Sequence, residues 1–168
     1  MSDIQNQWDN VPRRGPFLGI DLGSKTLGLA LSDGGLRVAS PLGLHKSRKF
    51  SLDAKELAVA IDHHQVTAMV LGMPLRMDGS WGARAQSTKG FAHNLRAKAG
   101  IKIPIFFWDE RMTTAEVERM LIKEMDMTRK RRANVIDKLA ATVILQNFLD
   151  AYNTARHKQK NDSEQVVS

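Results

Sequence analysis

The sequence contains no cysteine and no long hydrophobic run. Without cysteine the chain forms no disulfide and no cysteine-ligated zinc site, and this composition fits a reducing cytosol. No apolar stretch approaches the roughly 18 residues needed to cross a membrane. Residues 1–10 are polar and acidic, unlike the basic and then apolar start of a secretory signal. We therefore expect a cytoplasmic protein without a membrane segment.

Several catalytic motifs are also missing. The sequence has no Gly-x-x-x-x-Gly-Lys-Ser/Thr phosphate loop and no Gly-x-Ser-x-Gly nucleophile elbow. Its histidines lack the spacing of metal ligands, since His63 and His64 adjoin at a predicted helix end, where successive side chains diverge by about 100°. A phosphate-loop nucleotide site, a serine nucleophile and a histidine metal site are therefore disfavoured.

What the chain does have is ordinary apolar content and an excess of positive charge. Its 168 residues are 42% hydrophobic, which is enough for one domain with a substantial core. The formal net charge is +7. A basic balance indicates an acidic partner, and nucleic acid is the first candidate.

Apolar patterns along the chain predict an α/β fold with the order β-β-β-α-β-α-β-α-α, a mixed five-stranded sheet with helices on its faces. The predicted strands cover residues 17–22, 27–31, 36–44, 67–73 and 103–108. The predicted helices cover about 51–64, 82–99, a segment that starts at 113–116, and 133–152. Residues 1–16 are predicted to be a flexible lead-in and 153–168 a disordered polar tail, leaving 17–152 as the domain.

The first strand carries a carboxylate near its end. In residues 17–22 the side chains alternate, so Asp21 shares a face with Phe17 and Gly19. A half-buried carboxylate costs several kcal/mol unless a cation or hydrogen-bond donors compensate it. The alternative is an aspartate that merely caps the turn through its own backbone.

Three further acids are expected near Asp21. Asp109 and Glu110 end the last strand, and Asp137 lies one turn into the last helix, among small side chains that permit close approach to the sheet. Adjacent strand residues point to opposite faces, so we favour Glu110 as the partner of Asp21, with Asp109 in support. These acids also have non-catalytic explanations. Asp109 and Glu110 could form ion pairs with Arg111, and Asp137 could be placed in the first turn of its helix because the helix dipole favours an acid there.

Clustered carboxylates repel one another and require positive charge. Mg²⁺ or Mn²⁺ would suit them, because both ions prefer oxygen ligands. We expect Asp21, Glu110 and Asp137 to be the metal ligands. Two such ions about 3.5–4 Å apart would clamp the attacking and leaving oxygens of a phosphodiester.

Basic residues are expected to hold a nucleic-acid backbone around these acids. Contacts from lysine and arginine to phosphates position a strand without reading its sequence. The alternative for the basic run before Asp137 is a solvated linker. The candidate nucleic-acid-binding residues are Lys25, Arg76, Arg84, Arg111, Arg129, Lys130, Arg131 and Arg132.

Together these segments resemble one family, YqgF, also called RuvX-like. The resemblance covers about residues 17–152. Its motifs are Gly19-Ile20-Asp21-Leu22-Gly23-Ser24-Lys25, Gly72-Met73-Pro74-Leu75, Asp109-Glu110-Arg111 and Asp137-x-x-Ala140. The resemblance implies a ribonuclease H-like fold with strand order 3-2-1-4-5. It also implies that Asp21, Asp109, Glu110 and Asp137 are the acidic catalytic set.

Members of that family are described as cytoplasmic nucleases that mature the 5′ end of the small-subunit (16S) ribosomal RNA precursor, and also as Holliday junction resolvases. The resemblance thus implies a metal-dependent endonuclease acting on precursor ribosomal RNA or on branched DNA, as a monomer or homodimer. Many ribonuclease H-like enzymes carry an acid at the end of the fourth strand, where this chain has Met73 and Pro74. The second acid is therefore expected from the fifth strand.

Two other classes of protein remain as alternatives. A non-catalytic nucleic-acid-binding module would need the basic residues and not the acids. An actin-like or sugar-kinase ATPase also opens with Asp-Leu-Gly-Ser before a strand, but it needs a second half with its own phosphate loop. Replacement of Asp21 by asparagine separates the enzyme from the binding module.

Overall fold

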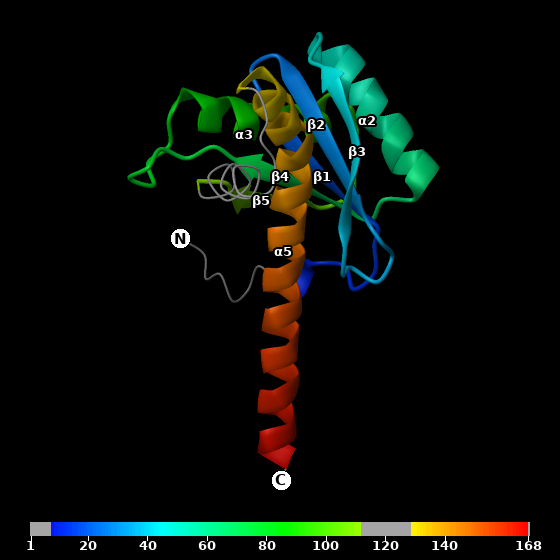
Figure 1. Ribbon diagram of the computed structural model, residues 1–168. Helices are drawn as coiled ribbons and strands as arrows, with labels where there is room; N and C mark the ends of the chain where they lie inside the picture. The colour runs from blue at the N-terminus through cyan, green and yellow to red at the C-terminus, as the bar shows by residue number, and fades with distance from the viewer. Residues whose placement is uncertain (1–7, 112–128, 168) are drawn as a thin grey trace.

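A computed structural model describes residues 8–111 and 129–167, apart from the side chains of residues 129–130, 132–138 and 166–167. The strands are β1 (Phe17–Leu22), β2 (Thr26–Ser32), β3 (Ala39–Lys46), β4 (Ala68–Met73) and β5 (Ile105–Asp109). The helices are the short 3-10 helix η1 (Trp8–Asn10), α2 (Phe50–His64), α3 (Ala83–Ala97) and α5 (Arg129–Val167) (Figure 1). The helix predicted to start at 113–116 lies outside the described residues.

The five strands form one sheet in the order β3-β2-β1-β4-β5, which confirms the predicted order. β1 pairs antiparallel with β2, and β2 with β3. β1, β4 and β5 run parallel to one another. The carboxyl ends of these three strands therefore lie at one edge of the sheet, where open α/β folds place their ligands.

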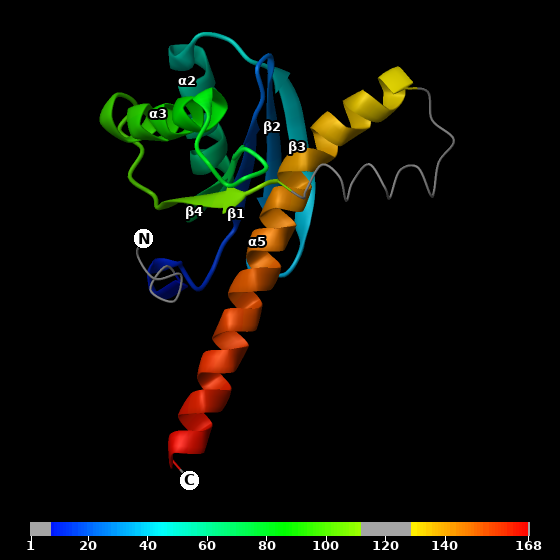
Figure 2. The same ribbon diagram turned by 90° about the vertical axis from the view of Figure 1, so that its left-hand side faces the viewer.

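Each face of the sheet has its own core. Leu18 and Ile20 of β1 pack with Leu57 of α2 and Leu95 of α3. Phe17 faces the other way and packs with α5. Figure 2 shows α2 and α3 together on one side of the sheet and α5 on the other. The period-two alternation of β1 assigns Asp21 to the α5 face.

α5 lies closely against β1 because Gly19 has no side chain. A Cβ atom at Gly19 would lie 2.8 Å from Leu145 Cβ and 3.0 Å from the carbonyl oxygen of Ala141. One strand period earlier, Phe17 meets Phe148, with ring centroids 6.4 Å apart. The helix therefore runs antiparallel to β1, and its backbone at position 137 is one turn beyond Ala141, toward the Asp21 end of the strand.

The third strand begins later than the sequence pattern predicts, at residue 39 rather than 36. Leu36 adopts a left-handed conformation with φ of 60° and is buried. The Asp33 carboxylate accepts hydrogen bonds from the backbone amides of Arg37 (2.7 Å) and Val38 (3.0 Å). These hydrogen bonds extend the turn, so β3 begins only at residue 39.

The ends of the chain carry more secondary structure than predicted. α5 continues through residues 153–167, where we predicted a disordered tail, and that segment contains no glycine or proline to stop the helix. In the predicted flexible lead-in, Trp8 packs on Phe148 with ring centroids 5.3 Å apart. α5 has 39 residues. Even so, neither α5 nor another helix in the described part of the chain combines the length and apolarity that crossing a membrane requires.

Candidate active site

The structure brings the Asp21 and Glu110 side chains together at the carboxyl edge of the sheet. Asp21 is the penultimate residue of β1. Glu110 directly follows β5, and its backbone amide donates a hydrogen bond (3.3 Å) to the carbonyl oxygen of Met73 at the end of β4. The two carboxyl groups share a side-chain hydrogen bond. Strands β1 and β5 thus deliver two acids to one point.

Glu110 is an unusual carboxyl group. Burial raises its pKa to about 7, and the neighbouring charges of Asp21 and Asp109 and the hydrogen bond with Asp21 act in the same direction. Arg84 opposes the shift. Near neutral pH the Asp21–Glu110 pair therefore binds a proton for part of the time. A bound cation could take the place of that proton.

Asp109 points elsewhere. It is exposed, and its Oδ2 atom accepts from Arg111 Nη2 at 2.6 Å and Nε at 2.7 Å. Its Oδ1 atom accepts from the backbone amide of Arg111 at 3.1 Å. The two neighbouring acids therefore diverge, and Glu110 is the one beside Asp21. Asp109 anchors an arginine instead.

Gly72 in β4 makes room for Glu110, because a Cβ atom there would collide with Glu110 Oε2 and lie 2.5 Å from Ile144 Cδ1. We expect Gly72→Ala to displace the ends of the Glu110 and Ile144 side chains and to lower the free energy of unfolding by about 1 kcal/mol, the low end of overpacking, because both ends can move. Urea denaturation measures the loss. Gly90→Ala in α3 is the control, since nothing lies within 4 Å of a Cβ there. The same unfolding midpoint in Gly72→Ala and parent would contradict this packing.

A cleft of about 390 Å³ opens beside Glu110. Three arginines from separate segments line it: Arg76 after β4, Arg84 in the first turn of α3, and Arg111 after β5. Gly82 lets Arg76 pack closely, since a Cβ at Gly82 would lie 2.8 Å from Arg76 Nε. Nothing in the local sequence marks Gly82, which sequence reasoning missed. The complete lining is Pro74, Leu75, Arg76, Met77, Gly82, Ala83, Arg84, Glu110 and Arg111.

The other predicted site residues are less closely defined. Lys25 is exposed in the β1–β2 turn, and Arg131 is exposed near the start of α5. The side chains of Arg129, Lys130, Arg132 and Asp137 lie outside the described part of the chain. Within that part, no three histidine, aspartate or glutamate side chains form a metal-binding group. Of the three predicted metal ligands, Asp21 and Glu110 are therefore in contact, and Asp137 is described by its backbone alone.

Solved structures with similar folds include a Holliday junction resolvase and a protein bound to a Holliday junction substrate. The yeast mitochondrial Holliday junction resolvase Ydc2 matches 96% of this chain and 89% of its own, with a TM-score of 0.57 and 12% identity. T. thermophilus RuvC, in complex with a Holliday junction substrate, matches 84% of this chain and 95% of its own, with a TM-score of 0.50 and 15% identity. With the strand order, these likenesses define the class: the chain has a ribonuclease H-like fold.

The sequence narrows the class to a family of nucleases. The family model for RuvX, described as Holliday junction resolvase, matches residues 15–151. This chain belongs to the RuvX family. A relative in Rhodospirillum rubrum is 47% identical over 93% of this chain and 96% of its own length. One in Phenylobacterium zucineum is 50% identical over 83% and 89%. Both are named "Putative pre-16S rRNA nuclease".

Proposed function

We propose that this chain is a metal-dependent endonuclease that processes the 5′ end of the small-subunit (16S) ribosomal RNA precursor. The observation that carries the proposal is the contact between the Asp21 and Glu110 carboxyl groups, at a strand edge beside a cleft lined by arginines. The names of the curated relatives support this substrate.

The acids at this edge fit a divalent metal ion. Asp21 and Glu110 offer hard oxygen ligands. Burial and the nearby Asp21 charge raise the pKa of Glu110, and a bound cation would offset both by stabilising the ionised carboxylate. Asp21, Glu110 and Asp137 would hold Mg²⁺ or Mn²⁺. When bound, the ion supplies Lewis-acid activation for hydrolysis of a phosphodiester.

The arginines of the cleft would bind and orient the strand. Arg76 and Arg84 present cations beside Glu110, and Asp109 holds the Arg111 guanidinium in a fixed position. Such contacts fix a phosphate near the carboxylates without selecting a base. Lys25 and the basic run 129–132 would extend this backbone contact beyond the cleft.

A second candidate function is resolution of Holliday junctions. The description of the matching family model favours it. The same carboxylates would hydrolyse the same kind of bond, so the two candidates differ in the shape of the substrate and not in the chemistry.

The decisive experiment offers purified protein two substrates, the 5′ region of the 16S precursor RNA and a four-way DNA junction. Each is incubated with Mg²⁺, with Mn²⁺ and with chelator. We expect cleavage of the RNA with metal, loss of cleavage in chelator, and recovery when Mg²⁺ is restored. Cleavage that persists in chelator would overturn the metal-dependent mechanism. Cleavage of the junction and not of the RNA would favour the second candidate.

A further inference from the structure

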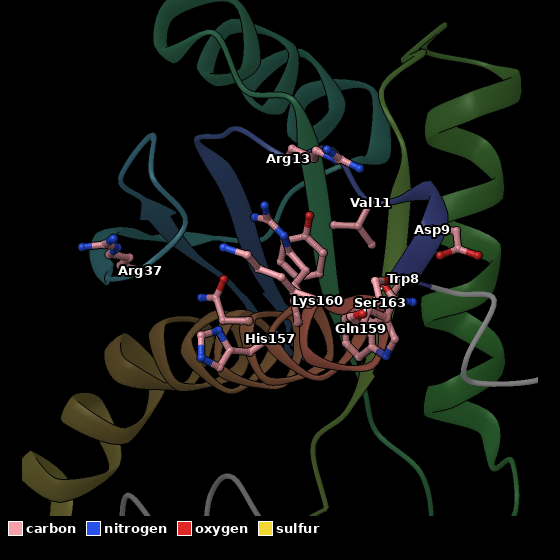
Figure 3. A pocket seen from close by; sticks show the side chains of 12 residues that line it. Trp8, Asp9, Val11, Arg13, Arg37, His157, Gln159, Lys160 and Ser163 are labelled. Carbon is pink, nitrogen blue, oxygen red and sulfur yellow. Dashed lines mark hydrogen bonds between the residues drawn. The ribbon is translucent and has the colours of Figure 1, made fainter. Parts of the chain in front are cut away.

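A second basic pocket, of about 690 Å³, lies at the opposite end of the molecule from Asp21. It is formed by η1 and the chain that precedes β1, by the β2–β3 turn, and by the C-terminal half of α5 (Figure 3). The residues that line it include Trp8, Asp9, Arg13, Arg37, Arg156 and Lys160.

The charge of this pocket is strongly positive. Arg13, Arg37, Arg156 and Lys160 are exposed, and Asp9 is the one carboxylate in the lining. Within the described residues, none of these four cations forms an ion pair with a carboxylate. In the view of Figure 3, Arg37 lies on one side of the hollow and Asp9 on the other, with Lys160 and Arg13 between them. Like charges held together in this way favour an anionic ligand.

Hydrogen bonds and aromatic packing hold the segments that form the walls of the pocket. Asn153 Nδ2 of α5 donates to the carbonyl oxygen of Leu36 at 2.8 Å, and Gln146 Nε2 donates to that of Arg37 at 2.9 Å. Trp8 packs on Tyr152 with ring centroids 5.9 Å apart, and the Arg156 guanidinium lies 5.4 Å from the Tyr152 ring centroid. Arg156 therefore lies against an aromatic pair that is itself packed.

This pocket is separate from the catalytic edge. Apart from Arg37, every lining residue lies outside the segment 15–151 that the family model matches. Along α5, positions 137 and 156 are 19 residues apart (156 − 137), which at a rise of about 1.5 Å per residue is about 29 Å. No step of the proposed hydrolysis uses these residues.

We propose that the pocket binds the phosphate backbone of the RNA strand at a distance from the cleavage point. Exposed arginines and a lysine around one hollow are suited to contact the phosphates of a nucleic-acid strand. A separation of about 29 Å corresponds to roughly nine stacked nucleotides at about 3.4 Å per phosphate. This inference rests on the proposed RNA substrate and gives that RNA a second binding site on the protein.

The test measures binding rather than cleavage. A 24-nucleotide single-stranded RNA is titrated into protein that carries Asp21→Asn, over a range of salt concentrations. We expect Arg156→Gln/Lys160→Gln to raise Kd about tenfold and to reduce the salt dependence by about 1.4, which is two contacts at about 0.7 each. A second variant, Arg13→Gln/Arg37→Gln, removes cations from the other walls and is expected to act in the same way.

The matched control is Lys55→Gln/Lys98→Gln, which removes the same charge from α2 and from the end of α3 on the other face of the sheet. Equal Kd values and salt slopes for the pocket and control variants would overturn the proposal. Loss of binding to anionic phospholipid vesicles, with RNA binding intact, would overturn it in favour of a membrane surface. Because the readout is affinity, failure to cleave the RNA precursor would refute the proposed function without altering this comparison.

Discussion

Asp21→Asn is expected to reduce cleavage of the preferred substrate at least 1,000-fold, equivalent to about 4 kcal/mol of transition-state stabilisation. The substitution keeps the size and polarity of the side chain and removes the charge that a metal ion requires. Because Asp21 contributes to the raised pKa of Glu110, its neutralisation also lowers that pKa toward the ordinary value. Single-turnover cleavage in saturating Mg²⁺ measures the loss.

Folding and binding distinguish this loss from a structural defect. The variant is expected to unfold at the same temperature as the parent or slightly higher, because repulsion with Glu110 is removed, and to retain its affinity for RNA. Asp62→Asn, an exposed change on α2, is the control and should cleave normally. Normal cleavage by Asp21→Asn would contradict the catalytic role of Asp21, whereas RNA binding without cleavage by the parent under every metal condition would favour a nucleic-acid-binding module.

The sequence predicted the sheet well because β1 and β4 carry strong local patterns. The alternation of Phe17, Leu18, Gly19 and Ile20 assigns each side chain to a face, and the two cores follow that assignment. The start of β3 was predicted wrongly because it depends on hydrogen bonds that the Asp33 carboxylate accepts from two backbone amides, which periodicity does not reveal.

The site was predictable in outline and not in detail. Alternation shows that Asp109 and Glu110 diverge, but which of them meets Asp21 depends on where β5 ends against β4. Met73 pairs with Asp109 and then accepts the backbone amide of Glu110, so the choice is made by pairing between strands. The raised pKa of Glu110 likewise comes from burial in the assembled fold.

The basic pocket could not be predicted from any single segment. Arg13 lies in a stretch that reads as a flexible lead-in, Arg37 in a turn, and Arg156 in a polar tail. The structure joins them because α5 continues without interruption and Asn153 hydrogen-bonds to the β2–β3 turn. Each cation taken alone is an ordinary exposed side chain, and only their assembly around one hollow is informative.

The stability of the metal-free protein is expected to depend on Glu110. Its pKa rises from 4.5 to about 7 on folding, so the folded state binds more protons between these values. Stability therefore falls as pH rises from about 4.5 to about 7 and levels off above that. At about 1.4 kcal/mol per unit the loss is roughly 3 kcal/mol, which lowers Tm by on the order of 10 °C.

Glu110→Gln should abolish this component, because glutamine does not ionise, whereas Glu164→Gln on the exposed part of α5 should retain it. Thermal unfolding in chelator from pH 5 to pH 8 measures the difference between the variants. Saturating Mg²⁺ should stabilise the parent more at pH 8 than at pH 5, since a cation replaces the proton that the Asp21–Glu110 pair otherwise shares. Equal slopes for Glu110→Gln and parent would show that Glu110 ionises normally in the folded protein. In that case, repulsion between the Asp21 and Glu110 carboxylates in the metal-free protein would not explain why this edge of the sheet needs a metal ion.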